Sequence, residues 1–360
     1  MGIFDFFSKA EALLAVDIGS SGVKMLELDL AGDKPRLVTL GFAPLTEEVF
    51  SNNLLGRPEP VAERLTQLLE SNAVGDKRVV TAMPGPGVFT KRVTMPAAAP
   101  KELRSNILFE AGSFIPHNID EVRLDYHVIG SAGKGKIDVL VVAVKNEVID
   151  SFSSCLSLCG LEAAVVDVDY YALQNMFELS YPEFVAGTTA LINIGARYSS
   201  INICRGGQSL FTGDVTVGGK VFTETIAQET GIALADAENV KRAFSKGQTT
   251  DEPVKEIIDR TVEQVASELN RQLSFFWNAS GAEDGIERIM VTGGGALVPG
   301  LVEELREKTG VDCVVIDPFR GIEMGEEVDQ QYLKELAPVM SICVGMGIRQ
   351  PGDKESPELE

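Results

Sequence analysis

The sequence predicts an α/β protein of two lobes, each built on a copy of the same folding unit, with a smaller subdomain inserted in the first. Apolar strands alternate with amphipathic helices along most of the chain, as in layered α/β folds. One hairpin pattern recurs about half a chain length after its first appearance. A strand–helix–strand–strand block at residues 88–159 interrupts the alternation, and this interruption identifies the insert.

The composition excludes several classes of function and of binding site. The chain has 360 residues, which is enough for two or three structural units, and 44% of them are hydrophobic. A formal net charge of −21 argues against binding to nucleic acid, which depends on Lys and Arg neutralising phosphates. Five cysteines and two histidines do not support a disulfide framework, a His-rich metal site or a Ser-His-Asp triad.

The repeated hairpin is the strongest internal signal. The stretch LAVDIGSSGVKMLEL can be laid on ALINIGARYSSINIC, which places Asp17 opposite Asn193 and Gly19 opposite Gly195. In each copy a buried strand leads into a glycine turn and a returning strand. A duplicated fold explains this order, although a chance match of two hairpins is an alternative.

Segment boundaries follow from the changes in pattern. Residues 1–9, MGIFDFFSK, are apolar but too short to span a bilayer, so they form either a docking peptide or an arm packed on the protein's own core. The absence of a signal-peptide pattern predicts a cytoplasmic location. The predicted units are an arm at 1–12, a first lobe at 13–87 and 160–187, the insert at 88–159, a second lobe at 188–350 with an outer subdomain at 218–285, and an acidic disordered tail at 351–360.

Three glycine turns follow apolar strands, at residues 19–22, 195 and 293–295. Glycine lets backbone N–H groups approach phosphate oxygens closely, and turns at the ends of neighbouring strands can converge on one ligand. In the first turn, Ser20 and Ser21 add hydroxyl donors and Lys24 adds a positive charge. Asp17 would hold Mg²⁺ through water, because Mg²⁺ keeps several of its waters. Taken alone, Asp17 fits an acid that caps a turn better than it fits a metal site.

Two further segments fit a nucleotide. The turn GGGA, Gly293–Ala296, allows a base to lie flat against backbone, although its glycines also suit a tight strand-to-helix turn. In AENVK, Glu238 and Lys241 are three residues apart on a predicted helix. They form either an exposed ion pair or contacts to a ribose and a base.

This combination resembles the actin-like ATPase (ASKHA) superfamily, whose two halves have a ribonuclease-H-like fold, and within it the PilM family of type IV pilus assembly. DIGSSGVK resembles the first phosphate loop, NIGARYSS the second, and VTGGGALVPG the adenosine loop. Further resemblance to PilM proteins lies in KRVTMP, FEAGSFIPHNIDEVRLDYHVIG and GLEAAVVDVDYYAL, so that it covers nearly the whole chain.

The resemblance implies ATP and Mg²⁺ bound between the lobes. The implied nucleotide-binding residues are Asp17, Gly19, Ser20, Ser21, Lys24, Asn193, Gly195, Ala196, Arg197, Gly218, Gly219, Glu238, Lys241, Gly293, Gly294, Gly295 and Ala296.

The resemblance also implies a partner. PilM proteins bind the short cytoplasmic N-terminus of the membrane protein PilN between the insert and the first lobe. Through PilN and PilO they are coupled to the inner-membrane platform and the pilus motor, so the protein is expected at the inner membrane through its partners. The resemblance also allows a homo-oligomer. For the partner groove the insert offers Phe109, Phe114 and Leu124.

One departure bears on catalysis. Actin-like hydrolases usually carry an acid in the second phosphate loop, where this chain has Asn193. An amide brings no charge to a metal and cannot act as a base, so ATP binding with at most weak hydrolysis is expected. Asp167 and Asp169, between the lobes, either orient water or have a structural role.

Two other classes remain open at this point. A small-metabolite kinase of the same superfamily would need a base near the γ-phosphate, and the sequence offers no clear one. A division protein like FtsA would carry a basic amphipathic C-terminal segment, whereas this chain ends in GDKESPELE. A pilus-related secretion adaptor is not distinguished from a pilus protein by the sequence.

Overall fold

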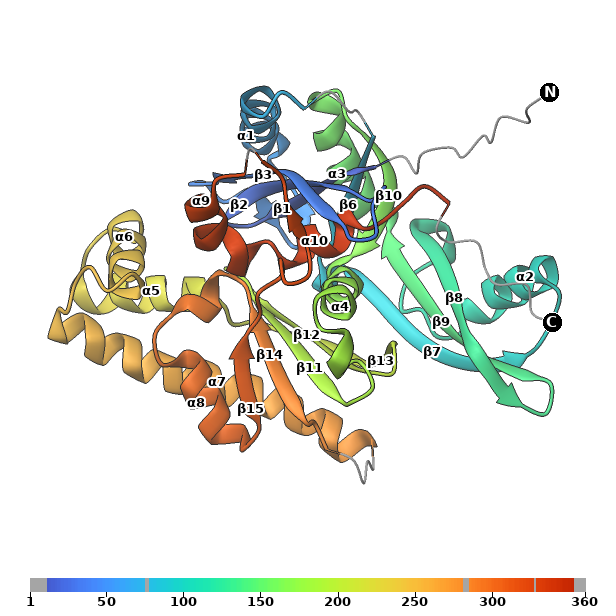
Figure 1. Cartoon of the computed structure of the whole chain (residues 1–360). Helices are drawn as coiled ribbons and strands as arrows, with labels where there is room; N and C mark the ends of the chain where they lie inside the picture. The colour runs from blue at the N-terminus through green and yellow to red at the C-terminus, as the bar shows by residue number, and fades with distance from the viewer. Residues whose placement is uncertain (1–11, 75–77, 281–284, 327, 353–360) are drawn as a thin grey trace.

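The computed structural model describes residues 12–74, 78–280, 285–326 and 328–352, which form two lobes and a protruding insert (Figure 1). The predicted N-terminal arm and acidic tail lie almost wholly outside the described residues. The three sheets that organise these parts have six, five and three strands.

The first lobe is built on a six-stranded sheet in the order β10-β6-β1-β2-β3-β16. Apolar side chains of the sheet pack on one face against α1 and α3, forming a core that includes Val16, Met25, Leu65 and Phe152. The elements of this lobe are β1 (Leu14–Gly19), β2 (Gly22–Asp29), β3 (Arg36–Pro44), β4 (Phe50–Ser51), β5 (Leu54–Leu55), α1 (Pro58–Ser71), β6 (Arg78–Met83), η1 (Gly85–Gly87), α3 (Asn146–Leu158), β10 (Glu162–Val168) and β16 (Glu323–Met324).

The second lobe has a five-stranded sheet in the order β13-β12-β11-β14-β15, covered by α5, α7 and α8. The long helix α7 buries one face, whose apolar residues are Val254, Ile257, Ile258, Val262, Val265, Leu269, Leu273 and Phe276. The elements are β11 (Thr189–Ile194), β12 (Ser199–Arg205), β13 (Gln208–Val215), α5 (Gly219–Thr230), α6 (Leu234–Ser245), α7 (Glu252–Ser280), β14 (Arg288–Thr292), η4 (Gly294–Leu297), α8 (Leu301–Thr309) and β15 (Asp312–Val315).

The two sheets repeat one topology. In the first, β1 pairs antiparallel with β2 and parallel with β6; in the second, β11 pairs antiparallel with β12 and parallel with β14. The register places Asp17 opposite Lys24 and Asn193 opposite Ser200. The repeated hairpin in the sequence therefore corresponds to a repeated hairpin in the fold.

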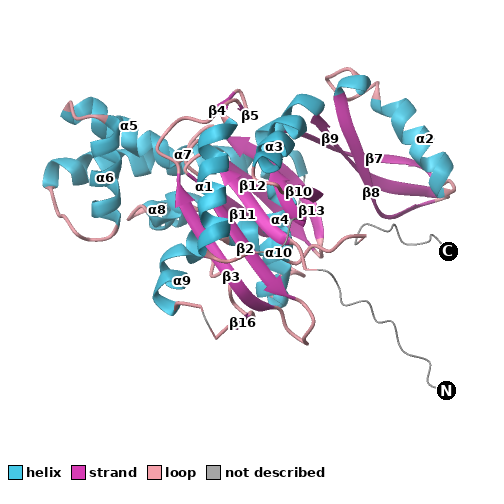
Figure 2. Ribbon diagram, turned by 90° about the horizontal axis from the view of Figure 1, so that it is seen from above, coloured by secondary structure: helices cyan, strands magenta, loops and turns pink. Residues whose placement is uncertain are grey.

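The insert is a separate three-stranded sheet with one helix, and Figure 2 shows it projecting from the body of the protein. The sequence placed its end at residue 159, but α3 packs on α1 in the core of the first lobe. The helix packs through Leu103 and Ile107 on Met95, Val139 and Val141 of the sheet. The insert comprises β7 (Val88–Pro96), α2 (Pro100–Ala111), η2 (Ile119–Glu121), β8 (Val122–Gly133) and β9 (Lys136–Lys145), in the sheet order β7-β9-β8.

Two helices, α4 (Asp169–Ser180) and α10 (Ser341–Gly347), lie between the two large sheets (Figure 1). Their side chains form one core with residues of both sheets, including Leu26 of the first and Leu191 of the second. Three further elements contribute to this shared core: η3 (Pro182–Phe184), α9 (Gln330–Leu336) and η5 (Ala337–Val339).

The C-terminal part returns to the first lobe. The sequence placed everything from 188 to 350 in the second lobe, but β16 pairs with β3 of the first sheet, and α10 contacts β1 and β2. Neither element was expected, because a two-residue strand and a seven-residue helix leave little periodic signal. The nine-residue strand β3 and the four-residue edge strand β15 were also missed.

Three further observations concern membrane-spanning helices, cysteines and metal ligands. Within the described ranges, no helix is both long and apolar enough to cross a membrane. All five cysteines are free, and Cys155 is buried in the first lobe's core. No group of three or more metal-ligating side chains occurs in the part of the chain that the structure describes.

Candidate functional site

The first glycine turn joins β1 to β2 at the junction of the lobes. Asp17 is buried, and the Lys24 ammonium donates a hydrogen bond to its carboxylate at 2.7 Å. Gly22 is required by packing, because a Cβ there would overlap the ring of Phe42. Packing does not require a glycine at position 19, because a Cβ added there would meet only ordinary contacts at 3.4 Å and beyond. Packing therefore does not explain the glycine at position 19.

The Asp17–Lys24 pair sets the electrostatics of this turn. Burial alone would lower the pKa of Lys24, but the Asp17 carboxylate outweighs it and raises that pKa above its ordinary value. Lys24 was predicted to supply charge to a phosphate, and in this structure its charge is directed at Asp17.

The second glycine turn, between β11 and β12, is fastened to the start of α5. The Gly219 N–H donates to the Gly195 carbonyl at 2.9 Å, and the Lys220 N–H donates to the Ala196 carbonyl at 2.9 Å. A Cβ on Gly218 would lie 2.6 Å from both of these carbonyls, so only glycine allows the approach. The predicted residues 195–196 and 218–219 thus form one structural unit.

The third glycine turn follows β14 and packs against the second. Gly293 has φ +89°, in the left-handed region, and a Cβ on it would lie 2.6 Å from the Asn193 side-chain oxygen. A Cβ on Gly295 would overlap the side chain of Ile194. These contacts bring together Asn193 and the GGGA turn, as predicted, at the ends of neighbouring parallel strands.

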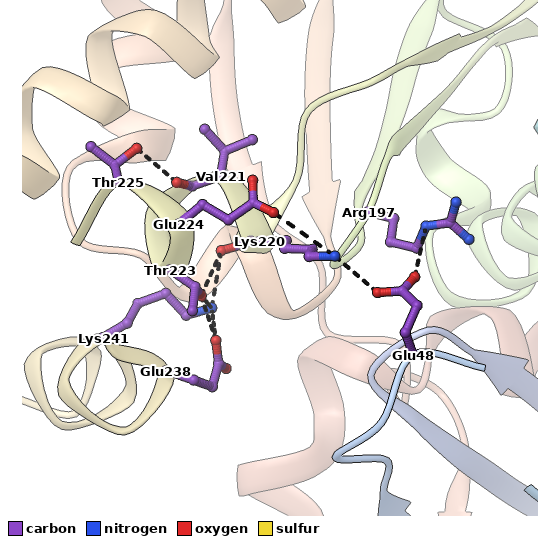
Figure 3. A network of polar contacts seen from close by, with 10 residues as sticks. Glu48, Arg197, Lys220, Val221, Thr223, Glu224, Thr225, Glu238 and Lys241 are labelled. Carbon is purple, nitrogen blue, oxygen red and sulfur yellow. Dashed lines mark hydrogen bonds and ion pairs between the residues drawn. The ribbon is translucent and has the colours of Figure 1, made fainter. Parts of the chain in front are cut away.

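Glu238 and Lys241 lie together on α6, and both reach across to α5 (Figure 3). The Lys241 ammonium donates to Glu238 at 2.6 Å, to the Thr223 hydroxyl at 3.0 Å and to the Gly219 carbonyl at 3.0 Å. Burial lowers the pKa of Lys241. For Glu238, burial would raise the pKa, but the contacts with Lys241 and Thr223 outweigh burial and lower that pKa. The predicted ion pair is present but half-buried rather than exposed, and it holds α6 against the start of α5.

A buried acid pair that the sequence did not predict as a pair lies beside these turns. Asp169, at the start of α4, accepts from the Tyr198 hydroxyl at 3.3 Å, and Asp214, on β13, accepts from the Tyr170 hydroxyl. One oxygen of each carboxylate has no hydrogen-bond partner among the described residues. Asp214 was missed because a single acid at the end of a strand carries no local signal.

Burial, and secondarily the charge of Asp214, raises the pKa of Asp169 to about 8. Burial also raises the pKa of Asp214 to about 6, against the effect of its hydrogen bond with Tyr170. The charge of Asp17 contributes to the raised pKa values of Asp169 and Tyr198, which places the first turn near both of them. The lobes therefore meet at a group of ionisable side chains.

Asp167 has a structural role. The Arg349 guanidinium donates to its carboxylate at 2.7 Å, so this acid ties β10 to the residues after α10. Of the two acids predicted between the lobes, only Asp169 lies among the polar groups of the junction.

The three predicted partner-binding residues do not lie in one cluster. Phe114 and Leu124 pack together in the small core of the insert, and the Phe114 ring stacks on Phe89. Phe109 on α2 is 88% exposed. A single exposed apolar side chain is common on protein surfaces, so the exposure of Phe109 alone does not identify a contact surface.

The two duplicated sheets, the helix pair between them and the glycine turns at their junction are the features of an actin-like protein. Among solved structures, ethanolamine utilization protein EutJ from Carboxydothermus hydrogenoformans matches with TM-score 0.57 and 13% identity, over 94% of this chain and 89% of that one. MreB5 of Spiroplasma citri bound to ADP matches with TM-score 0.51 and 10% identity, over 94% and 95%. The fold is accordingly actin-like, with an insert.

A more specific relationship is evident at the family level. The family model described as type IV pilus assembly protein PilM matches residues 15–351, so the chain belongs to that family. A solved PilM–PilN type IV pilus biogenesis complex matches with TM-score 0.84 and 26% identity, covering 95% of this chain and 99% of that one.

Neutralising Asp169 tests the electrostatics of the junction. Because its folded pKa lies above the unfolded value of roughly 3.9, the native state retains a proton that the unfolded state loses, and stability falls as pH rises toward about 8. Asp169→Asn should melt higher than the original protein near pH 8 and show a flatter pH dependence of Tm.

The control is Asp150→Asn, an exposed acid on α3. It should leave the pH dependence of Tm unchanged. Parallel melting curves for Asp169→Asn and the original protein between about pH 5 and pH 8 would contradict the assignment of a raised pKa.

Proposed function

We propose that this chain is an ATP-binding adaptor of the type IV pilus assembly complex that binds the cytoplasmic N-terminus of PilN. The observation that carries the nucleotide part is the fixed arrangement of the glycine turns, with Asn193 and Gly293 in contact and Gly218 against Gly195. Membership of the PilM family and the match to a PilM–PilN complex support the partner.

The proposed nucleotide lies between the turns. Gly19, whose glycine the packing does not require, leaves room for a phosphate near the backbone, with Ser20 and Ser21 as donors. Lys24 would exchange part of its interaction with Asp17 for a phosphate oxygen. Bound Mg²⁺ would neutralise phosphate charge, and Asp17 is the carboxylate available to hold its waters.

The base and ribose would lie against the third turn and α6. Ala296 and Gly294 provide a surface without bulky side chains, and a Cβ on Gly294 would meet nothing closer than 3.7 Å. Glu238 and Lys241 supply a carboxylate and an ammonium at the neighbouring helix. Arg197, which follows the second turn, remains a proposed member of the site.

Hydrolysis is proposed to be weak. Asn193 stands where a charged acid would assist a metal, and an amide cannot accept a proton from water. Asp169 has a pKa of about 8, so near neutral pH most of this carboxyl is protonated and unavailable as a base. The site therefore suits retention of ATP better than its turnover.

The adaptor role requires that the nucleotide site and the insert be connected. The insert's β7 meets the second lobe through a hydrogen bond between the Thr90 and Thr212 hydroxyls at 3.1 Å. Close by, Gly85 fits against Tyr170 and Asp214 without space for a side chain. ATP that fixed the two lobes would thereby fix the insert, an ordering effect that needs no hydrolysis.

The partner surface is proposed to include Phe109 of α2, together with Phe114 and Leu124. Binding PilN there would hold the protein on the cytoplasmic side of the inner membrane and couple it, through PilN and PilO, to the platform and motor. Self-association of the protein within the assembled complex is a further proposal.

Replacing Asp17 tests the nucleotide site. Asp17→Ala should weaken Mg-dependent ATP binding by about tenfold or more, because a carboxylate that orients a metal's waters is lost. Isothermal titration with ATP in the presence and absence of Mg²⁺ measures the effect. Asp17→Asn keeps a hydrogen-bond partner for Lys24, so weaker ATP binding by this variant is not explained by unfolding.

The matched control for this replacement is Asp29→Ala, a partly exposed acid at the far end of β2. It should bind ATP like the original protein. Equal affinities for the Asp17 variants and the control would show that the first phosphate loop is misassigned.

Replacing Phe109 tests the partner surface. Phe109→Ser should weaken binding of a peptide with the PilN N-terminal sequence by roughly tenfold, since a buried aromatic anchor contributes on the order of 1.4 kcal/mol or more. Fluorescence anisotropy of the labelled peptide measures this. Leu158→Ser, at an apolar residue of α3 that is 61% exposed, is the control.

Unchanged peptide affinity in Phe109→Ser would exclude this residue from the surface. Failure of the original protein to bind the peptide, with or without ATP, would remove the adaptor proposal altogether.

A further inference from the structure

A short segment of the first lobe reaches across to the second lobe beside the predicted phosphate loops. It runs from the end of β3 to β4, residues 45–50, and it begins with the Leu45 N–H donating to the Ser21 carbonyl of the first turn at 3.1 Å. Three residues later, Glu48 contacts two cations of the other lobe (Figure 3). We call residues 45–50 the bridging segment.

Glu48 holds both cations with one carboxylate. Its Oε2 lies 2.9 Å from the Lys220 ammonium, and its Oε1 lies 3.6 Å from Nε of Arg197. Arg197 belongs to the second turn, and Lys220 lies in the first turn of α5, whose backbone is bonded to that same glycine turn. A carboxylate is also favoured at the N-terminus of a helix. Glu48 therefore connects the two proposed phosphate loops.

A second contact fixes the same segment. The Arg197 guanidinium lies 5.9 Å from the centre of the Phe50 ring, and Phe50 in turn packs on Phe152 of the first lobe's core, with ring centres 6.1 Å apart. Arg197 thus contacts the bridging segment through both a charge and an aromatic face. The aromatic contact involves Phe50 at the end of the bridging segment, and the Glu48 ion pairs link the middle of the segment to the second lobe.

The strength of this connection suits a reversible contact. The side chains of Glu48, Lys220 and Arg197 are 53%, 41% and 30% exposed, so each ion pair is weak and screened by salt. Buried pairs would lock the lobes, whereas exposed pairs that share one carboxylate can open and close.

We propose that Glu48 is a latch across the lobe junction that slows the release of bound nucleotide. It acts on the opening of the lobes and makes no contact with the nucleotide, so it is a positioning residue. This inference rests on the proposed nucleotide binding, and it adds a regulatory element: any partner or ion that competes for Glu48, Arg197 or Lys220 would speed nucleotide exchange.

The test compares Glu48→Gln with Glu47→Gln. Glu47 is the neighbouring acid of the same segment, but its ion pair, with Arg57 at 2.5 Å, stays within the first lobe. Dissociation of a fluorescent ATP analogue with Mg²⁺ should be about two- to fivefold faster in Glu48→Gln, the range expected for exposed ion pairs. Glu47→Gln should match the original protein, and high salt should abolish the difference.

Lys220→Gln, combined with Glu48→Gln in a double variant, completes a double-mutant cycle. If the latch is the Glu48–Lys220 contact, the double variant should release nucleotide at nearly the rate of the faster single variant. Fully independent effects of the two substitutions would overturn the latch, as would an unchanged release rate in Glu48→Gln. Tighter ATP binding with unchanged release would mean that Glu48 competes with phosphate, which also overturns it.

A measurement without nucleotide separates this inference from the proposed function. Amide hydrogen exchange at residues 195–197 and 218–220 should speed up in Glu48→Gln and not in Glu47→Gln. If the original protein binds no ATP but these amides respond, the proposed function fails and the bridging contact stands. If ATP binds and these amides do not respond, the latch fails alone.

Discussion

The close packing of α10 on α4 is the contact on which the rest of this structure depends. A side chain at Gly345 would overlap the Ala172 carbonyl, so the two helices touch backbone to backbone between the sheets. Gly347 approaches the first sheet in the same way, since a Cβ there would lie 2.7 Å from Leu26. Overpacking of this kind typically costs about 1–3 kcal/mol, and this contact sets how the two lobes meet.

The same C-terminal segment touches the proposed site from two sides. Burial, and secondarily the charge of Asp17, raises the pKa of the Cys343 thiol, which places this residue of α10 near the first turn. The Pro338 carbonyl accepts the Gly293 N–H at 2.6 Å and the Thr292 hydroxyl at 2.8 Å, at the third turn. One segment therefore positions the first and third turns together, although they belong to different lobes.

Local sequence was sufficient for the parts of the fold that carry local patterns. The repeated hairpin predicted the shared topology of the sheets, and the glycine turns predicted Asn193 beside Gly293. The C-terminal return to the first lobe could not be predicted, because β16 and α10 are short and their partners lie near the start of the chain. Asp214 and Glu48 were missed for a related reason: their significance comes from residues far away in sequence.

The junction of the lobes combines weak and strong connections, and the proposed coupling depends on this combination. The α4–α10 packing fixes the base of the junction, while Glu48 at its edge forms only exposed ion pairs. A ligand between the lobes can then alter the edge without disturbing the base. The insert is linked to the second lobe by the hydrogen bond between Thr90 and Thr212, so a change at the edge of the junction would be transmitted to it.

The most direct measurement of this account is the affinity for ATP with Mg²⁺, determined by calorimetry with and without a saturating PilN N-terminal peptide. Coupling between two sites is reciprocal, so the peptide should tighten ATP binding by the same factor by which ATP tightens peptide binding, about fivefold or more. Equal ATP affinities in the presence and absence of bound peptide would contradict the account.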